Sequence, residues 1–181
     1  MKETMEEMIE IPAGIEIKVE RGIVHVKGPK GEVKRTLLSP RVKLGVADNK
    51  VSIKAEKATK REGALIGTFK AHIRNLIKGV SEGHVYKLKV CSGHFPMSVS
   101  VSGNEFMVKN FLGESVPRKL RIKEGVSVKV DGSDVVVESV DKELAGQTAA
   151  SIEELTKRPG FDKRIFQDGI YIYIKDGREL R

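Results

Sequence analysis

Two groups of basic residues are the strongest candidates for chemistry in this sequence. The first follows a loop at Gly113 and consists of Arg118, Lys119, Arg121 and Lys123. The second flanks Pro159-Gly160-Phe161 and consists of Lys157, Arg158, Lys163 and Arg164. Arginine can bridge two phosphate oxygens with its planar guanidinium, and lysine supplies a compact positive charge. Both groups therefore indicate binding of a phosphate-rich partner.

The second group has the stronger claim. It falls in an irregular stretch between an expected helix and an expected strand, where Pro159 and Gly160 interrupt regular structure. Phe161 either stacks on a nucleic-acid base or anchors the loop. The first group is as well explained by a solvated surface. We expect Arg158 and Arg164, at the two ends of the loop, to matter most.

The residues that suit catalysis or metal binding are too few or too poorly spaced. A structural zinc ion needs four ligands, and Cys91 and His94 have no second Cys/His pair to complete the set. A Cys91 nucleophile needs a histidine base, and nothing brings His72, on an expected helix, near it. The segment 28–31 lacks the spacing of a phosphate-binding loop. We expect no catalytic residues, no metal and no cofactor.

The composition of the 181 residues supports an anionic partner. The formal net charge is +8, from 33 lysines and arginines against 25 aspartates and glutamates. An excess of this sign suits nucleic acid or an acidic surface. No stretch approaches the roughly 18 apolar residues that a membrane helix needs. The acidic N-terminal residues do not resemble a targeting signal, and Cys91 is the only cysteine. We expect a cytoplasmic protein that does not contact a membrane.

The elements that position these residues occur twice along the chain. The matching segments are Val24 and Val26 with Phe106 and Val108, Val51 and Ile53 with Val135 and Val137, and the helical stretch 67–78 with 146–157. The connection before the second helix is shorter than the connection before the first. A repeat of this kind indicates two small domains of one design.

Each unit is predicted to have an α+β fold, mostly antiparallel β-sheet with one α-helix packed on it. Thr59 and Glu62 form a capping box for the first helix, and Gly79 is predicted to end it. The second helix is predicted to begin near Asp141 and to end at Pro159. The expected domains are residues 1–82, with a short N-terminal extension, and residues 83–181, with a basic C-terminal RNA-binding segment.

Seven strings give the sequence a resemblance to a known family. They are GPKG at 28–31, IGTF with HIRN at 66–75, GVSEG at 79–83, SGHFP at 92–96, NFLGE at 110–114, GQTAA at 146–150 and RIFQDGIY at 164–171. Together they resemble large-subunit ribosomal protein L-six in its archaeal and eukaryotic form. They span nearly the whole chain and stand in the order that the family has.

The resemblance implies two tandem domains without catalysis, bound to large-subunit ribosomal RNA beside the factor-binding region and the sarcin–ricin stem-loop. It implies that the second domain makes the main RNA contacts. The candidate rRNA-binding residues are Ser92, His94, Lys109, Arg118, Lys119, Lys157, Arg158, Lys163, Arg164 and Arg178. Neighbouring large-subunit proteins and translation factors at the factor-binding site are further expected partners.

Two other functions are compatible with the same features. A free-standing RNA-binding or RNA-chaperone module shares the charge and the duplication. A protein–protein adaptor shares only the duplication. Salt separates the adaptor from the RNA-binding proteins, because neutralising several phosphates makes affinity fall steeply as salt rises.

Overall fold

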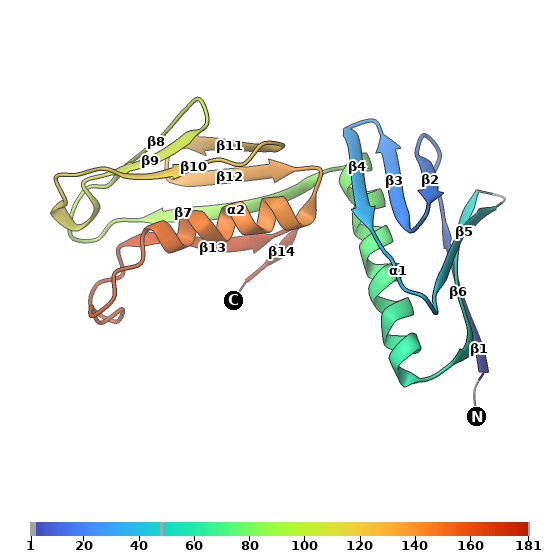
Figure 1. Ribbon diagram of the computed structural model, residues 1–181. Helices are drawn as coiled ribbons and strands as arrows, with labels where there is room; N and C mark the ends of the chain where they lie inside the picture. Colours follow the sequence, from blue (N-terminus) through green and yellow to red (C-terminus); the bar gives the residue numbers. More distant parts are fainter. Residues whose placement is uncertain (1–2, 48, 181) are drawn as a thin grey trace. The chain divides into compact units, whose positions relative to one another are not determined.

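The computed structural model describes residues 3–47 and 49–180. It divides into two compact units, Met1–Gly83 and His84–Arg181, which we call unit 1 and unit 2. Figure 1 shows that each unit combines antiparallel strands with one long helix, which confirms the α+β class. In the described part of the chain, no helix is both long and apolar enough to cross a membrane.

Unit 1 has two three-stranded antiparallel sheets and one helix. Its elements are β1 (Glu3–Glu10), β2 (Glu16–Glu20), β3 (Ile23–Gly28), β4 (Gly31–Thr36), β5 (Lys43–Ala47), β6 (Lys50–Ala58) and α1 (Lys60–Ser81). One sheet has the order β1-β6-β5 and the other β2-β3-β4. Helix α1 packs against strands of both sheets, and its residues Ile66, Phe69 and Ile73 are buried.

The N-terminal segment is a strand, where the sequence predicted only an extension. β1 pairs in antiparallel register with β6 along its length. Its acidic side chains form ion pairs with lysines of β6: Glu6 lies 3.9 Å from Lys54, and Glu10 lies 3.3 Å from Lys50. Opposite charges on facing strands stabilise a sheet, so a segment with little apolar patterning still forms a strand.

The predicted end of the first helix is wrong by two residues. Gly79 lies inside α1 and is buried. The residue with positive φ is Gly83, at +81°, and its amide donates to the carbonyls of Gly79 and Lys78 at 3.0 and 3.2 Å. This geometry satisfies the last helical carbonyls and needs glycine at position 83. The predicted capping box of Thr59 and Glu62 is confirmed.

The hairpin between β3 and β4 packs against the end of α1. The amide of Lys30 donates to the carbonyl of Val80 at 2.9 Å. A Cβ at Gly28 would lie 2.8 Å from the Val80 side chain, so only glycine permits this approach. The segment 28–31 is therefore the tight hairpin that its composition predicted, with a packing role against the helix.

Unit 2 has one three-stranded and one five-stranded antiparallel sheet. Its elements are β7 (His84–Cys91), β8 (Ser98–Ser102), β9 (Glu105–Lys109), the 3₁₀ turn η1 (Phe111–Gly113), β10 (Arg118–Arg121), β11 (Val126–Asp131), β12 (Asp134–Ser139), α2 (Lys142–Leu155), β13 (Gly169–Lys175) and β14 (Arg178–Glu179). The sheet orders are β10-β9-β8 and β11-β12-β7-β13-β14. Phe106, Leu88, Ile152 and Ile170 lie at the centre of its core.

Helix α2 begins as predicted and ends earlier than predicted. Asp141 is its N-cap, with the carboxylate accepting from the Glu143 amide at 2.8 Å. The helix ends at Leu155, and Thr156 closes it by donating its hydroxyl to the Glu153 carbonyl at 3.2 Å. Pro159 therefore lies beyond the helix, in the loop.

The two units share one order of elements. In each, a long strand leads into a three-stranded sheet, then into a two-stranded hairpin that pairs with the long strand, and then into the helix. Unit 2 continues with β13, which pairs with the second edge of β7. Within the described residues, β1 of unit 1 has a strand on one edge alone.

Candidate nucleic-acid interface

The connection between α2 and β13 carries the second basic group, and we call residues 156–168 the basic loop. Its first residue, Thr156, is held in place because its hydroxyl accepts a hydrogen bond from the Ile170 amide at 2.9 Å. Its last residue, Asp168, is held in place because its carboxylate accepts hydrogen bonds from the amides of Gly93 at 2.7 Å and His94 at 3.0 Å. The loop is therefore held at both ends although it has no regular structure.

Asp168 also holds the side chain of His94. The carboxylate lies 2.6 Å from Nδ1 of the imidazole and is only 3% exposed. Burial opposes ionisation of this carboxyl, but the hydrogen bonds from the backbone and ring of His94 and from Gly93 outweigh it and lower the pKa. Asp168 therefore stays a carboxylate near neutral pH and joins the loop after β7 to the loop before β13.

Three rings and one guanidinium lie in sequence along the basic loop, and we call them the stacked row. The His94 and Phe166 centroids are 5.1 Å apart, and Phe166 meets Phe161 edge to face at 4.8 Å. The guanidinium of Arg158 lies over the Phe161 ring, 4.3 Å from its centroid. Such contacts orient a charge without consuming all its hydrogen-bond donors.

Arg118 is committed to contacts within unit 2. It forms two hydrogen bonds to Glu114, at 2.7 and 2.8 Å, and lies 4.4 Å from the centre of the Phe111 ring. Its Nη1 donates to the carbonyls of Leu155 and Lys157, which caps the end of α2. Arg118 thus fixes the start of the basic loop and has few donors left for a partner.

The hydrogen bonds from Arg118 have a second consequence for the same site. They lower the pKa of Glu114, and the charges of Arg118 and Arg158 act in the same direction against the effect of burial. Glu114 therefore stays ionised, 3.9 Å from Nη1 of Arg158. The guanidinium of Arg158 therefore contacts the Phe161 ring and also forms a long ion pair with the Glu114 carboxylate.

The remaining cations of the basic loop differ in how far their charge is neutralised. Arg164 forms a two-pronged pair with Asp162, at 2.8 to 3.2 Å, while its side chain is 90% exposed. The Arg164 hydrogen bonds lower the pKa of Asp162. Lys157 lies 3.9 Å from Glu154. Lys163 is exposed and forms no ion pair with the residues that the structure describes.

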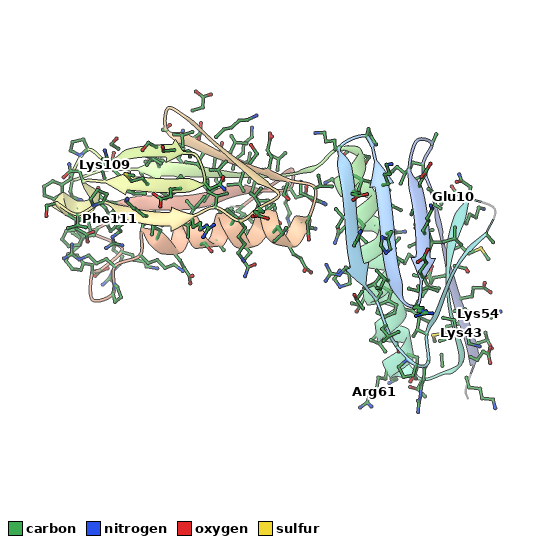
Figure 2. All side chains as sticks on the ribbon, turned by 45° about the horizontal axis from the view of Figure 1, so that its top comes forward. Glu10, Lys43, Lys54, Arg61, Lys109 and Phe111 are labelled. Atoms are coloured by element: carbon green, nitrogen blue, oxygen red, sulfur yellow. The ribbon has the colours of Figure 1, made fainter. Side chains whose placement is uncertain are left out.

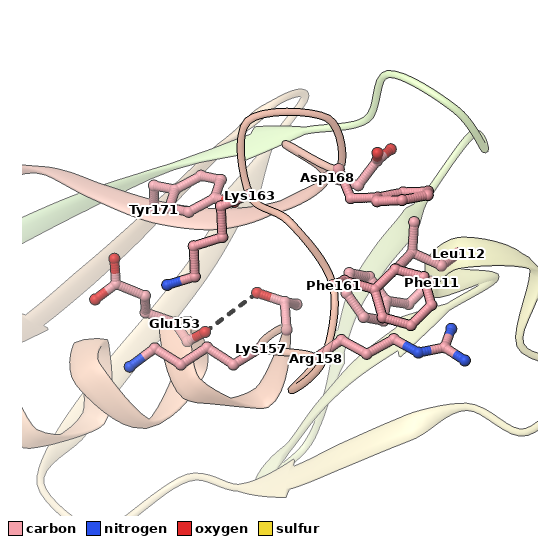
Figure 3. Close-up of a pocket in the computed structure, with 11 residues that line it drawn as sticks. Phe111, Leu112, Glu153, Lys157, Arg158, Phe161, Lys163, Asp168 and Tyr171 are labelled. Atoms are coloured by element: carbon pink, nitrogen blue, oxygen red, sulfur yellow. Dashed lines mark hydrogen bonds between the residues drawn. The ribbon is translucent and has the colours of Figure 1, made fainter.

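A cavity of about 310 Å³ opens beneath the loop. Figure 3 shows Lys157 and Lys163 directed to one side of it, beside Glu153, and the Arg158 guanidinium directed to the other side, next to Phe161. The basic side chains therefore spread over two faces of the loop. A bulky anion with charges on both flanks, such as a folded phosphate backbone, suits this arrangement better than a single small anion.

The other predicted contacts lie around this region or away from it. Ser92 is exposed beside His94, and Lys109 ends β9 at the same end of unit 2 as Phe111 (Figure 2). Lys119 is exposed on the edge strand β10 and lies 3.6 Å from Glu105. Arg178 lies on β14, at the opposite end of β13 from the basic loop. The structure thus gathers most of the predicted residues and separates Arg178.

Sequence reasoning missed the residues that hold the site together. They are Asp168, Phe166, Glu114 and Phe111, which carry the ion pairs and ring contacts described above. The strings SGHFP and RIFQDGIY both drew attention in the sequence, but no local pattern showed that they touch. A buried carboxylate joined to a histidine more than seventy residues away has no sequence signature.

The fold and the site together define a class of protein. A duplicated α+β scaffold presents exposed cations on a loop whose backbone is held at both ends. These features are expected of a structural protein that binds a large anion. The ribosomal protein L6 family model matches residues 11–83 and 95–169, one segment in each unit.

Two relatives match almost the whole chain. The large ribosomal subunit protein uL6 of Methanococcus vannielii is 46% identical over 174 residues, covering 96% of each chain. The uL6 of Methanosarcina mazei is 47% identical over 167 residues, covering 92% of this chain and 95% of the relative. The chain belongs to the ribosomal protein L6 family, whose members are structural rather than enzymatic. The resemblance seen in the sequence is confirmed.

Proposed function

We propose that unit 2 of this large-subunit protein binds large-subunit ribosomal RNA through the basic loop, near the sarcin–ricin stem-loop and the factor-binding region. The family resemblance supports the location, and the geometry of unit 2 supports the choice of binding surface. Neighbouring ribosomal proteins and translation factors are the further partners that this location brings within reach.

One observation carries the proposal: Arg158 is held on the stacked row while its side chain stays partly exposed. Its side chain is 38% exposed, and its closest carboxylate oxygen is 3.9 Å away. A positively charged group that is already oriented loses little conformational entropy when it meets a phosphate. Lys163 adds an exposed charge on the same loop, and His94 lies at the far end of the row.

The geometry ranks Arg158 above Arg164, although the sequence gave them equal weight. Arg164 already shares its charge with Asp162, so a phosphate must compete with that carboxylate. Contacts of this kind position the protein on the RNA without reading base sequence, and specificity then comes from RNA shape.

A binding titration tests the proposal. The full chain is titrated with a large-subunit rRNA fragment that contains the sarcin–ricin stem-loop, over a series of salt concentrations. We expect Arg158→Glu to weaken binding roughly ten-fold or more and to lower the salt slope by about 1. Arg164→Glu has a smaller effect. Lys34→Glu, an exposed charge reversal on β4 of unit 1, is the matched control and leaves both quantities unchanged.

Circular dichroism of each variant separates lost binding from lost folding. Equal affinity and salt slope for Arg158→Glu and the parent protein would overturn the assignment of the basic loop. Sedimentation on a magnesium gradient with a high-salt wash then distinguishes the alternatives. A chain retained on the large subunit is an integral component, and a chain recovered free is a separate RNA-binding module. An adaptor would show weak salt dependence.

A further inference from the structure

Strand β1 of unit 1 has an open edge where its counterpart in unit 2 is covered. β7 pairs with β12 on one side and with β13 on the other. β1 pairs with β6, the counterpart of β12, and no described strand lies on its second edge. An uncovered edge presents backbone amides and carbonyls that can accept another strand.

The uncovered edge is bordered by a shallow groove between β1 and the second half of α1. The groove is lined by Met8, Ile9 and Glu10 of β1 and by residues of α1 that include Ile77. The helix alignment makes Ile77 equivalent to Thr156 of unit 2. Thr156 is the residue that accepts the amide of Ile170 at the start of β13. The groove therefore occupies the position that β13 fills in unit 2.

The side chains along β1 restrict what can occupy this edge. Glu6 and Glu10 are exposed, and their ion pairs with Lys54 and Lys50 of β6, at 3.9 and 3.3 Å, leave both carboxylates accessible to solvent. Glu7 pairs with Lys70 of α1 at 2.7 Å. An acidic strand repels a phosphate backbone, and a second copy of β1 would bring like charges together. Met8, on the same strand, is 58% exposed, so its apolar side chain is available to contact a partner. RNA and self-association are therefore poor occupants.

We propose that the open edge of β1 binds an extended basic segment of a neighbouring large-subunit protein, which adds to the sheet as β13 does in unit 2. An antiparallel segment would place an apolar residue opposite Ile9, as Ile172 lies opposite Leu88 in unit 2. Basic residues one position before and three positions after it would lie opposite Glu10 and Glu6. Backbone hydrogen bonds supply affinity in this mode of binding, and alternate side chains supply specificity.

Photo-crosslinking in assembled large subunits tests the proposal. The full chain carries p-benzoylphenylalanine in place of Met8, and a control chain carries it in place of Leu38, which is 72% exposed and lies outside β1. We expect the Met8 position to crosslink to one protein, within a segment that has the stated basic and apolar spacing, several-fold more than the Leu38 position.

Charge removal supplies the matched variants. Glu6→Gln with Glu10→Gln removes both charges without placing lysines opposite Lys54 and Lys50 of β6, and it should lower the crosslink yield at position 8 several-fold. Glu16→Gln with Glu20→Gln has the same spacing on β2 and should leave the yield unchanged. Crosslinks to rRNA, to another copy or within the same chain, or a yield no higher than at Leu38, would overturn the proposal. A probe in place of Phe161 reports rRNA contact in the same particles, so the two proposals fail separately.

Discussion

The equivalent first strands of units 1 and 2, β1 and β7, have different neighbours. β1 borders one neighbour and a groove, whereas β7 lies inside a sheet between β12 and β13. To reach the second edge of β7, the chain must pass from the end of α2 to the start of β13, and the basic loop is that passage. The comparison teaches that the candidate RNA-binding loop exists because unit 2 covers an edge that unit 1 leaves open.

The largest expected effect comes from loosening β13. Ile170 is fully buried in the core of unit 2. We expect Ile170→Ala to lower the free energy of unfolding of unit 2 by about 2–5 kcal/mol while unit 1 is unaffected. Hydrogen exchange measured separately on the peptides of each unit checks this. Ile23→Ala, at an exposed position of β3, is the control and should change stability by no more than about 0.5 kcal/mol.

A smaller effect is expected from the link between α2 and β13. Thr156→Val keeps the shape of the side chain but leaves the buried Ile170 amide without its acceptor. We expect a loss of about 1–3 kcal/mol in unit 2, with faster exchange at Ile170. Thr68→Val removes a hydroxyl that bonds to its own helix on an exposed face of α1, and it should be nearly neutral. Equal losses for the two variants would contradict the role of Thr156.

Acidification should act on the two helices differently. The hydrogen bonds from Thr59, followed in importance by one from Arg41, lower the pKa of Glu62 from its ordinary 4.5 to about 2 despite burial. The stability that Glu62 contributes is therefore complete above pH 4.5 and is lost as the pH falls toward 2. Helix α2 has Leu144 at the third position after its N-cap, where α1 has Glu62, so its start lacks this reciprocal contact. Amide exchange in α1 below pH 4.5 should show a weaker pH dependence in Glu62→Gln.

The smallest effects are expected from exposed ion pairs, one in each unit. Lys43 lies 3.2 Å from Glu56 in unit 1, and Lys119 lies 3.6 Å from Glu105 in unit 2. Both side-chain pairs are solvated, so Lys43→Ala and Lys119→Ala should each change the free energy of unfolding by less than about 1 kcal/mol. Denaturant titration checks this. Any loss of RNA affinity in Lys119→Ala is then a direct effect on binding.

Local signals in the sequence predicted the local structure well. The capping box at Thr59, the hairpin at 28–31 and the N-cap at Asp141 each depend on residues a few positions apart. Alternation of apolar residues likewise predicted most strands. β1 was not predicted because its side chains alternate little between apolar and polar, although its backbone pairs with β6 along its length. The end of α1 was misplaced because both Gly79 and Gly83 can end a helix.

The candidate site was predicted in outline only. Counting charges identified the basic loop, but the count could not distinguish Arg118, which caps α2, from Arg158, whose side chain is more exposed and makes fewer hydrogen bonds. The difference depends on the positions of Glu114 and Phe161 in space. No role for Asp168 could be predicted, because its partner His94 lies on a loop distant in the sequence.

The central place of β7 also sets the order in which the protein can acquire its structure. Unit 1 is a continuous stretch, so all of its pairings are available once Gly83 has left the ribosome that makes it. β7 is the first strand of unit 2 to be synthesised, yet one of its edges waits for β13. Contacts so distant along the chain form slowly. Unit 2 therefore exposes the second edge of β7 until β13 has been made, and translation speed through the helix and basic loop governs that exposure.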